Sequence, residues 1–317
     1  MKNAAIQFDY ASSKRLPTPT SKQPANVSKY LQASLAENTK KAYLNDIQHF
    51  RQWGGVIPTT ATSVAAYLAH YATSLATATL SRRVVAIGKA HTSQHYSSPT
   101  NSALVKATLQ GIRRLNGSAQ RQVLPAMKRD IQAMVKGMTG IKGVRDKALL
   151  LTGFAGAFRR SELVALQVAD IQFVKEGAVI RIRRSKTDQI GYGRRIAIPY
   201  ARGKTCPVTA IKEWLNQSNI TDGCLFRRIT KHGTVMDAGI TPQSVALVVK
   251  ERALAAGLDA AQYSGHSLRA GLATSAAKAG VAGWKIRQQT GHKSDAMLNR
   301  YIRDSQLFVD NANSSIW

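Results

Sequence analysis

Residues 264–303 read SGHSLRAGLATSAAKAGVAGWKIRQQTGHKSDAMLNRYIR and hold the chain's densest group of chemistry-bearing side chains. His266 and Arg269 are three positions apart, so on a helix both side chains project from the same face. The Ala-, Leu- and Lys-rich run that follows favours a helix as far as Lys278, and Gly280 is typical of a C-terminal cap. The stretch is therefore predicted to open with a helix that presents a basic and a titratable group together.

The second half of this stretch carries another histidine and a tyrosine. Gly291 and His292 are predicted to lie in a turn, and Ser294 can cap a further helix that carries Tyr301 between two arginines. An arginine fork matches the geometry of a phosphate, and a tyrosine hydroxyl becomes a nucleophile when its proton is removed. These residue types indicate chemistry on a phosphate. Each short motif is a common pattern by itself, so its weight depends on what the remainder of the chain adds.

The chain is long and strongly basic. Its 317 residues suffice for about two domains, and 44% of them are hydrophobic, enough for a core in each. The net charge is +28, of which residues 1–120 carry +11 and the remainder +17. Two basic halves predict a polyanion that is gripped from more than one side. A merely solubilising charge is the alternative, but the apolar periodicity of both halves argues against a disordered basic arm.

Cysteine usage and hydropathy bear on the compartment. Cys206 and Cys224 form no CxxC motif and are too few for a secreted disulfide framework, so we expect free thiols in the bacterial cytoplasm or nucleoid. The N-terminus lacks the apolar segment of a signal peptide, and no stretch approaches the roughly 18 apolar residues of a membrane span. We expect no association with a membrane.

The first part of the chain is predicted to be a flexible arm, residues 1–26, followed by an all-helical DNA-binding domain, residues 27–116. Four short helices are expected: one that begins near Asn38 and ends before Gly54, then residues 62–75, 78–92 and 102–115. In the third helix, Leu80, Val84, Val85 and Ile87 are expected to face inward. The basic residues predicted to lie on the outer faces and to contact DNA are Lys40, Lys41, Arg82, Arg83, Lys89, Arg113 and Arg114. His91 and His95 are interpreted as a solvated or DNA-facing pair, since no third metal ligand lies near them.

A polar linker, residues 117–124, separates this domain from a second one, residues 125–303. Helices are predicted over residues 125–138, 144–155, 206–216 and 240–256. Alternating apolar residues around Ile180 and Ile196 predict a small antiparallel sheet with a hairpin, and Lys186 lies at the start of its turn. The fold class is thus an all-α domain followed by a mixed α+β domain that is mainly helical with a small antiparallel sheet.

Taken together, five motifs in this order resemble the tyrosine recombinase (phage integrase) family, including its Cre-like and integrase branches. The motifs are Thr152-Gly153 before Arg159-Arg160-Ser161-Glu162, Arg184-Ser185-Lys186-Thr187, Gly265-His266-Ser267-Leu268-Arg269, Thr290-Gly291-His292, and Asn299-Arg300-Tyr301-Ile302-Arg303. His292 precedes Tyr301 by nine residues, as the family pattern requires. The resemblance covers roughly residues 125–303, and the helical domain before them matches the family's core-binding domain in size and position.

The resemblance implies a phosphate clamp. Arg159 and Arg269 would bind the non-bridging oxygens, where charge develops during phosphodiester transfer. His292 would donate a hydrogen bond to the scissile phosphate, and Glu162, one turn from Arg159, would orient its neighbours. Arg160 and Arg184, beside the motifs, are further candidates for DNA contacts. A surface ion pair between Arg159 and Glu162 is the plain alternative.

The resemblance also implies which groups move protons. Tyr301 would attack the phosphorus and hold the 3′ end of the cut strand as a phosphotyrosine. His266 would take the tyrosine proton, and Lys186 would protonate the leaving 5′ oxygen. For Lys186 the plain alternative is an ordinary hairpin lysine. The sequence has neither a carboxylate cluster for Mg²⁺ nor a P-loop, so we expect no metal, no ATP and no other cofactor.

The function that these motifs imply is a site-specific DNA recombinase or integrase, encoded by a mobile element or replicon. Its expected partner is double-stranded DNA with a specific inverted-repeat core site, bound by a homotetramer across two paired sites. A type IB topoisomerase and a catalytically inactive DNA-binding regulator are the alternatives. The C-terminal tail, residues 304–317, is unusually apolar, with Leu307, Phe308, Val309, Ile316 and Trp317. It is expected to dock on a neighbouring protomer or to fold back on its own domain.

Overall fold

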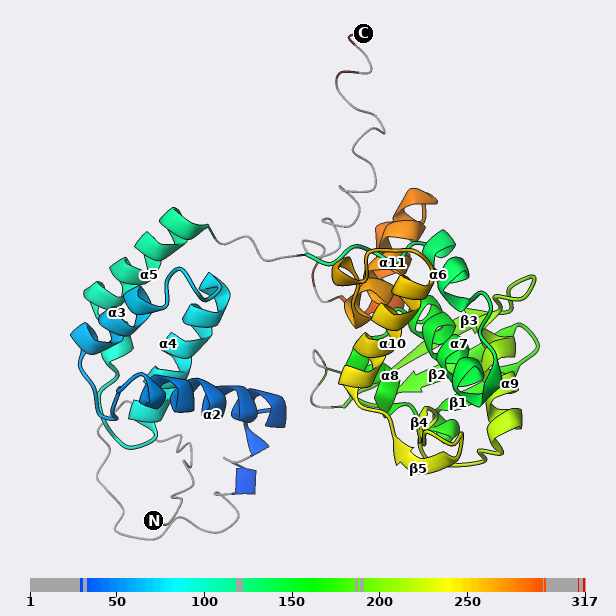
Figure 1. The fold of residues 1–317 in the computed structure, drawn as a ribbon, viewed down its shortest axis with the longest axis horizontal. Helices are drawn as coiled ribbons and strands as arrows, with labels where there is room; N and C mark the ends of the chain where they lie inside the picture. The colour runs from blue at the N-terminus through cyan, green and yellow to red at the C-terminus, as the bar shows by residue number, and fades with distance from the viewer. Residues whose placement is uncertain are drawn as a thin grey trace. The chain divides into compact units, whose positions relative to one another are not determined.

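The computed structural model describes residues 29–30, 33–117, 122–185, 188, 191–292, 294, 313 and 316. The chain divides into two compact units, Met1–Arg121 and Gln122–Trp317 (Figure 1). Each unit has its own hydrophobic core. The predicted fold class is confirmed, since a helical unit is followed by a mainly helical unit that contains a small antiparallel sheet.

The described part of the first unit is helical. Its elements are α2 (Glu37–Gln52), α3 (Ala61–His70), α4 (Thr77–Thr92), the 3₁₀ turn η1 (Pro99–Asn101) and α5 (Ala103–Asn116). Thr60 and Ser102 begin α3 and α5, because each hydroxyl accepts a hydrogen bond from a backbone N–H of the first helical turn. In space, α2 packs on α4 and α3 packs on α5. The buried faces meet in a core that contains Phe50, Tyr67 and Leu80.

In one helix of this unit the sequence prediction holds for Leu80, Val84 and Ile87 and fails at two other positions. In α4, Leu80, Arg83 and Ile87 are buried, whereas Val85 is largely exposed. Positions 80, 83 and 87 follow the three- and four-residue spacing of a single helix face, so the arginine lies on the core stripe. The predicted inward face of Val85 and the predicted outward face of Arg83 are therefore both wrong.

The second unit combines helices with two small sheets. Its helices are α6 (Lys128–Val135), α7 (Gly140–Ala155), α8 (Arg160–Ala165), η2 (Val168–Asp170), α9 (Pro207–Ser218), α10 (Pro242–Ala255), η3 (Ala260–Gln262), α11 (Gly265–Lys278) and α12 (Gly283–Thr290). Its strands are β1 (Ile171–Val174), β2 (Gly177–Ile182), β3 (Arg194–Pro199), β4 (Arg227–Ile229) and β5 (Val235–Gly239). The helix α7 packs on α9 around the fully buried Trp214, whose indole N–H donates to the Leu225 carbonyl.

The three-stranded sheet has the order β1–β2–β3 and is antiparallel throughout. Ile180 pairs with Ile196 and Ile182 pairs with Arg194, so these residues share one face of the sheet. That face is buried, which confirms the predicted hairpin. The strands β1, β4 and β5 were not predicted, because they are short and bury few side chains, which leaves no clear alternation.

Candidate active site

The turn before α8 places one arginine beside a buried carboxylate. Arg159 immediately precedes α8, and its backbone N–H donates to Glu162 Oε2 at 2.9 Å. Its guanidinium Nη1 donates to Glu162 Oε1 at 2.6 Å. The Glu162 side chain is 1% exposed, so this is not the surface ion pair of the plain alternative. Glu162 fixes both the backbone and the side chain of Arg159.

Arg269 ties three segments of the second unit together. It lies in α11 and is 1% exposed. Its Nη1 donates to the carbonyl oxygen of Ala157 at 2.8 Å and to that of Thr290. The turn before α8, the first half of α11 and the end of α12 therefore meet at this guanidinium. Both of these acceptors are neutral carbonyl groups.

The end of α12 positions the second histidine. Gly291 terminates the helix in the left-handed region, at a φ of +67°. The next residue, His292, is buried, and its Nδ1 lies 2.8 Å from Thr290 Oγ1. Burial, followed by the positive charges of Arg269 and Arg159, lowers the pKa of His292 to about 4. The imidazole is therefore neutral at physiological pH.

His266 lies in the first turn of α11 and is exposed. Ser264 caps this helix by accepting the His266 backbone N–H at 3.2 Å. Loss of water from part of the ring, followed by the charges of Arg269, Arg160 and Arg159, lowers the pKa of His266. A neutral imidazole that contacts solvent can accept a proton.

These contacts bring together five of the predicted site residues: Arg159, Glu162, His266, Arg269 and His292. In addition, Arg159 Nη2 donates to the Gly291 carbonyl at 3.3 Å, which joins the first motif to the fourth. The described groups supply two guanidiniums, two neutral imidazoles and one buried carboxylate. Such a set binds an anion and transfers protons beside it.

A further arginine belongs to this cluster and was missed in the sequence. Arg194, at the start of β3, donates from Nη1 to the Gln289 carbonyl at 2.7 Å, and its Nη2 lies 3.5 Å from Glu162 Oε2. Its guanidinium also packs against Gly291, where a Cβ would lie 2.9 Å from Arg194 Cζ. Burial lowers the pKa of Arg194. Strand alternation was the available signal, because position 194 shares a face with Ile196 and Ile198, and a charge on that face needs a partner.

Two predicted catalytic residues, Lys186 and Tyr301, lie outside the described residues, and so does the helix predicted to carry Tyr301. The backbone beside Lys186 is described at Ser185 and Asp188, which exchange two backbone hydrogen bonds at 3.2 and 3.1 Å. The Asp188 carboxylate accepts the backbone N–H groups of residues 191–193. The proposed roles of Lys186 and Tyr301 stay predictions.

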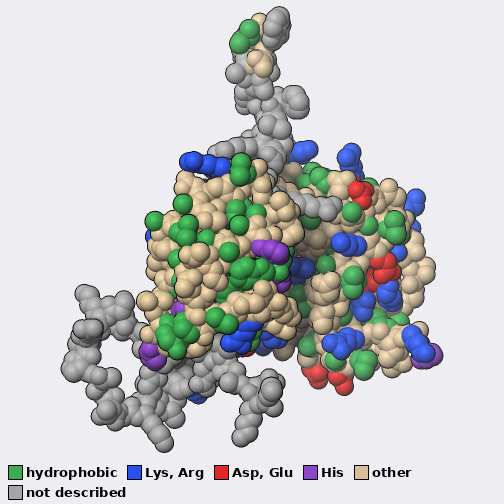
Figure 2. Space-filling view, turned by 60° about the vertical axis from the view of Figure 1, so that its left-hand side comes forward, with side chains coloured by type: hydrophobic (Ala, Val, Ile, Leu, Met, Phe, Trp, Pro, Cys, Tyr) green, Lys and Arg blue, Asp and Glu red, His purple; other side chains and the backbone are tan. Residues whose placement is uncertain are grey.

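The predicted DNA-contacting residues divide by exposure. Those that are exposed are Lys41, Arg82, Arg113, Arg114, Arg160 and Arg184, while Lys40 and Lys89 are half-buried. On the face shown in Figure 2, Lys and Arg side chains are visible at many more places than Asp and Glu. The prediction that Arg83 contacts DNA is wrong, because its guanidinium is buried and donates to the Tyr67 hydroxyl at 2.9 Å. The interpretation of His91 as solvated or DNA-facing is also wrong, since the side chain is buried and its Nε2 accepts the Thr59 N–H at 2.8 Å.

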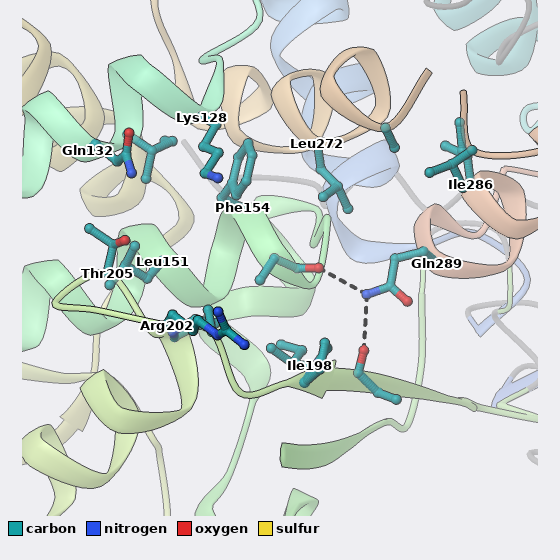
Figure 3. A pocket seen from close by; sticks show the side chains of 18 of the residues that line it. Lys128, Gln132, Leu151, Phe154, Ile198, Arg202, Thr205, Leu272, Ile286 and Gln289 are labelled. Atoms are coloured by element: carbon teal, nitrogen blue, oxygen red, sulfur yellow. Dashed lines mark hydrogen bonds between the residues drawn. The ribbon is translucent and has the colours of Figure 1, made fainter. Parts of the chain in front are cut away.

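A pocket of about 580 Å³ lies in the same unit, lined by residues of α6, α7, β3, α9, α11 and α12. Figure 3 shows apolar side chains around it, among them Leu151, Phe154 and Leu272. At one side Gln289 donates to the carbonyls of Ala155 at 2.9 Å and Ala197 at 3.4 Å. The same end of α12 therefore contributes to the wall of this pocket and to the arginine cluster.

No helix in the described part of the chain combines the length and the apolar character that a membrane span needs. Within the same part of the chain, no three His, Cys, Asp or Glu side chains gather as a metal site would require.

Comparison with known proteins places this geometry in a family. The model of the phage integrase family matches residues 125–307. The integrase/recombinase xerD homolog of Selenomonas ruminantium is 40% identical over 293 residues, which cover 89% of this chain and 86% of that protein.

Solved structures share the fold. XerH site-specific recombinase bound to palindromic difH substrate, in a post-cleavage complex, aligns with a TM-score of 0.65 at 16% identity, over 91% of this chain and 83% of XerH. A lambda integrase dimer bound to a COC′ core site aligns with a TM-score of 0.57 at 16% identity, over 88% of this chain and 76% of the integrase. The family match and the 40% identity together show that the chain belongs to the phage integrase family, the tyrosine-type site-specific DNA recombinases.

Proposed function

We propose that this recombinase cuts and rejoins DNA strands through a covalent phosphotyrosine link at Tyr301. The observation that carries the proposal is the convergence of Arg159, Arg269, His266 and His292. Hydrogen bonds of the two arginines join the segments of three sequence motifs, and burial followed by the charges of both arginines lowers the pKa of both histidines. Cations held in fixed positions stabilise the charge that develops on a phosphate in the transition state. The two guanidiniums would bind the non-bridging oxygens, and His292 would donate to one of them.

In the cleavage step the Tyr301 oxygen attacks phosphorus as the bond from phosphorus to the 5′ oxygen breaks. His266 accepts the tyrosine proton, which its lowered pKa and its exposure allow. Lys186 donates a proton to the departing 5′ oxygen. One phosphodiester is exchanged for another, so the strand can be resealed by the reverse reaction without ATP.

The test of this function is the trapping of the covalent adduct. A suicide substrate, nicked so that the released 5′ end diffuses away, should accumulate a protein–DNA adduct with the wild-type chain. Tyr301→Phe should bind the same DNA and form no adduct, because it lacks the nucleophilic oxygen. A Phe variant that still cleaves contradicts the assignment of Tyr301. An absent wild-type adduct, with DNA binding intact, would favour the inactive regulator.

The DNA site and the assembly are finer parts of the proposal. The solved relatives include XerH on a palindromic substrate and a lambda integrase dimer on a core site, which supports an inverted-repeat site for this chain. Exchange between two such sites requires four protomers. A type IB topoisomerase, the alternative enzyme, would relax DNA without a defined site, whereas a recombinase should cleave only its own core sequence.

We also propose that the tail, residues 304–317, docks in the apolar pocket of a neighbouring protomer. Support comes from chemical complementarity, since the tail carries Leu307, Phe308 and Val309 while the pocket is lined by Leu151, Phe154 and Ile286. Head-to-tail docking of this kind closes a ring of protomers. Folding back of the tail on its own domain is the alternative.

Deletion of residues 306–317 distinguishes the two arrangements. With docking on a neighbour, the shortened chain should fill one half-site normally, lose cooperative filling of the second, and form no synaptic tetramer. With folding back, the deletion should lower the thermal stability of the free monomer and leave cooperativity unchanged. Three further expectations stay predictions. They are the domain boundaries 27–116 and 125–303, action in the bacterial cytoplasm or nucleoid, and activity in the presence of EDTA.

A further inference from the structure

The chain enters the second unit along one side of α11. The backbone N–H of Leu124 donates to the Gln262 carbonyl at 2.8 Å, and the backbone N–H of Ala126 donates to the Ser267 carbonyl at 2.9 Å. Gln262 is the last residue of η3, and Ser267 lies in the first turn of α11. Residues 124–127, which we call the entry strap, are therefore bound on both sides of the point where α11 begins.

The entry strap is stiff because of its sequence. Pro125 fixes its own φ and favours extended backbone at the residue before it. In an extended chain successive N–H groups point to opposite sides, so the proline occupies the position whose donor would face away from α11. At the end of the strap the Met127 N–H donates to Asp130 Oδ2 at 2.9 Å, and the Tyr263 hydroxyl lies 3.5 Å from the same oxygen. The strap is thus also anchored to the start of α6.

A glycine inside α11 allows the entry strap to approach the helix closely. Gly271 lies in the middle of α11, where glycine is less favourable than alanine. A Cβ at this position would lie 1.9 Å from the Ala126 carbonyl oxygen and 2.7 Å from its carbon. Ala126 itself is fully buried. Backbone packs directly on backbone here, so the strap and the helix cannot shift independently.

The entry strap holds the part of α11 that carries two of the predicted catalytic residues. His266 and Arg269 lie in the same two turns of the helix as the contacts with the strap. Arg269 donates to carbonyls of two other segments, so a shift of these turns would displace its guanidinium. We propose that Pro125 and Ala126 are positioning residues, which hold these turns so that both side chains face the scissile phosphate. This role rests on the proposed functions of His266 and Arg269 in cleavage.

Two substitutions disturb the entry strap at different points. Pro125→Gly keeps both anchoring N–H groups and removes the stiffness, whereas Gly271→Ala places a methyl group against Ala126. Each should slow single-turnover cleavage of a suicide substrate by about 10- to 100-fold, the loss expected when catalytic groups are misplaced by about 1 Å. Noncovalent affinity for the same DNA should be unchanged. Gly111→Ala is the control, because it adds the same methyl group to α5, where nothing lies within 4 Å, and it should cleave at the wild-type rate.

A second measurement reads the position of the turn without any cleavage. The pKa of His266 is lowered by burial and then by three arginines, Arg269, Arg160 and Arg159. His292 is the other titratable group beside this imidazole. Displacement of the turn separates His266 from the two arginines at the start of α8 and admits water, so its pKa should rise in both strap variants and stay unchanged in the α5 control. An NMR titration of the full chain, with the signal identified by comparison with His266→Asn, measures the pKa.

These outcomes are distinguishable from a failure of the proposed function. If the wild-type chain forms no adduct, the recombination chemistry is wrong, and the titration of His266 still decides whether the strap positions the turn. Wild-type cleavage rates in the strap variants overturn the inference, and so does a wild-type pKa of His266. A loss of DNA binding as large as the loss of cleavage overturns it as well, because the strap would then hold only the fold. If Gly271→Ala does not fold, Pro125→Gly decides by the same criteria.

Discussion

Both units set two arginines against one buried carboxylate. In the first unit Asp46 of α2 accepts from Arg82 at 2.8 and 2.9 Å and lies 3.6 Å from Arg83 Nε. In the second unit Glu162 lies 2.6 Å from Arg159 and 3.5 Å from Arg194. In both units, two positive charges face one negative charge.

The difference lies in what the surroundings add. In the first unit Arg83 is buried beside the Asp46 carboxylate and also donates to the Tyr67 hydroxyl, so a carboxylate inside the core offsets its charge. In the second unit Arg269 donates to the carbonyls of Ala157 and Thr290, which orient its guanidinium. A buried carboxylate offsets the charge of an arginine that it binds, whereas a carbonyl group orients an arginine as a dipole. These partners distinguish Arg83 from Arg269, while Arg159, which Glu162 binds, is assigned to the proposed phosphate clamp through its hydrogen bond to the Gly291 carbonyl beside His292.

The largest expected effect is at the two guanidiniums of the proposed phosphate clamp, Arg269 and Arg159. Arg269→Ala and Arg159→Ala should each slow single-turnover cleavage by about 10²–10³-fold, the typical loss when one donor to a developing oxyanion is removed. Noncovalent binding of DNA should change far less. Arg195→Ala is the matched control, because it removes one positive charge from an exposed position on β3. A loss of binding as large as the loss of cleavage would mean that Arg269 only attracts DNA.

The second effect concerns stability in the first unit. Asp46→Asn should lower the free energy of unfolding by about 3 kcal/mol, because it leaves the buried Arg83 without its carboxylate. Urea unfolding of the full chain measures the change. Glu37→Gln removes an exposed carboxylate from the same helix, where it pairs with Lys40, and should leave the unfolding midpoint unchanged. An unchanged midpoint in Asp46→Asn would show that the network adds no stability.

The third effect is a pH dependence of the second unit. The pKa of His292 is about 4 in the folded chain and near 6.5 in the unfolded chain, so between these values the unfolded chain binds a proton that the folded chain does not. Stability should therefore be fully present above pH 6.5 and fall as the pH decreases toward 4, by at most about 3 kcal/mol. Urea midpoints of the wild type and of His292→Asn should converge on acidification. A constant difference between them would contradict the lowered pKa.

The sequence predicted elements where local pattern and packing agree. The helix end at Gly280, the turn at Gly291 and the alternation around Ile180 and Ile196 depend on neighbouring residues, and the structure has them. Glu162 was predicted beside Arg159 from their spacing, and the capping hydrogen bond of α8 realises that contact.

The features that were not predicted from the sequence involve side chains whose polarity conflicts with their buried position. Arg83 was assigned to the outer face by its residue type and Arg194 was not singled out, although helix spacing and strand alternation place both on buried faces. Their partners come from other elements, Asp46 from α2 and Gln289 from α12, and a local sequence pattern does not indicate such contacts. The apolar pocket was missed for the same reason, because its walls come from six separate elements.

The smallest expected effect tests whether Arg194 resembles Arg83 or Arg269. It has a carboxylate partner, Glu162, like the first, and a carbonyl partner, Gln289, like the second. Because it joins β3 to the end of α12, Arg194→Gln should loosen the Gly291–His292 turn and slow cleavage by about tenfold, or roughly 1.4 kcal/mol. Arg195→Gln removes the same charge from the next residue, which is exposed, and should cleave at the wild-type rate.

A titration of His292 decides how the loss at Arg194 arises. Arg194 is one of the cations that lower the pKa of His292, so the pKa should rise in Arg194→Gln and stay unchanged in Arg195→Gln. Arg194→Lys should restore part of the cleavage rate, because an ammonium group can donate to the Gln289 carbonyl but cannot span both partners. Equal rates and equal His292 pKa values in the Gln variants at 194 and 195 would place Arg194 with Arg83, as an arginine that only holds the fold.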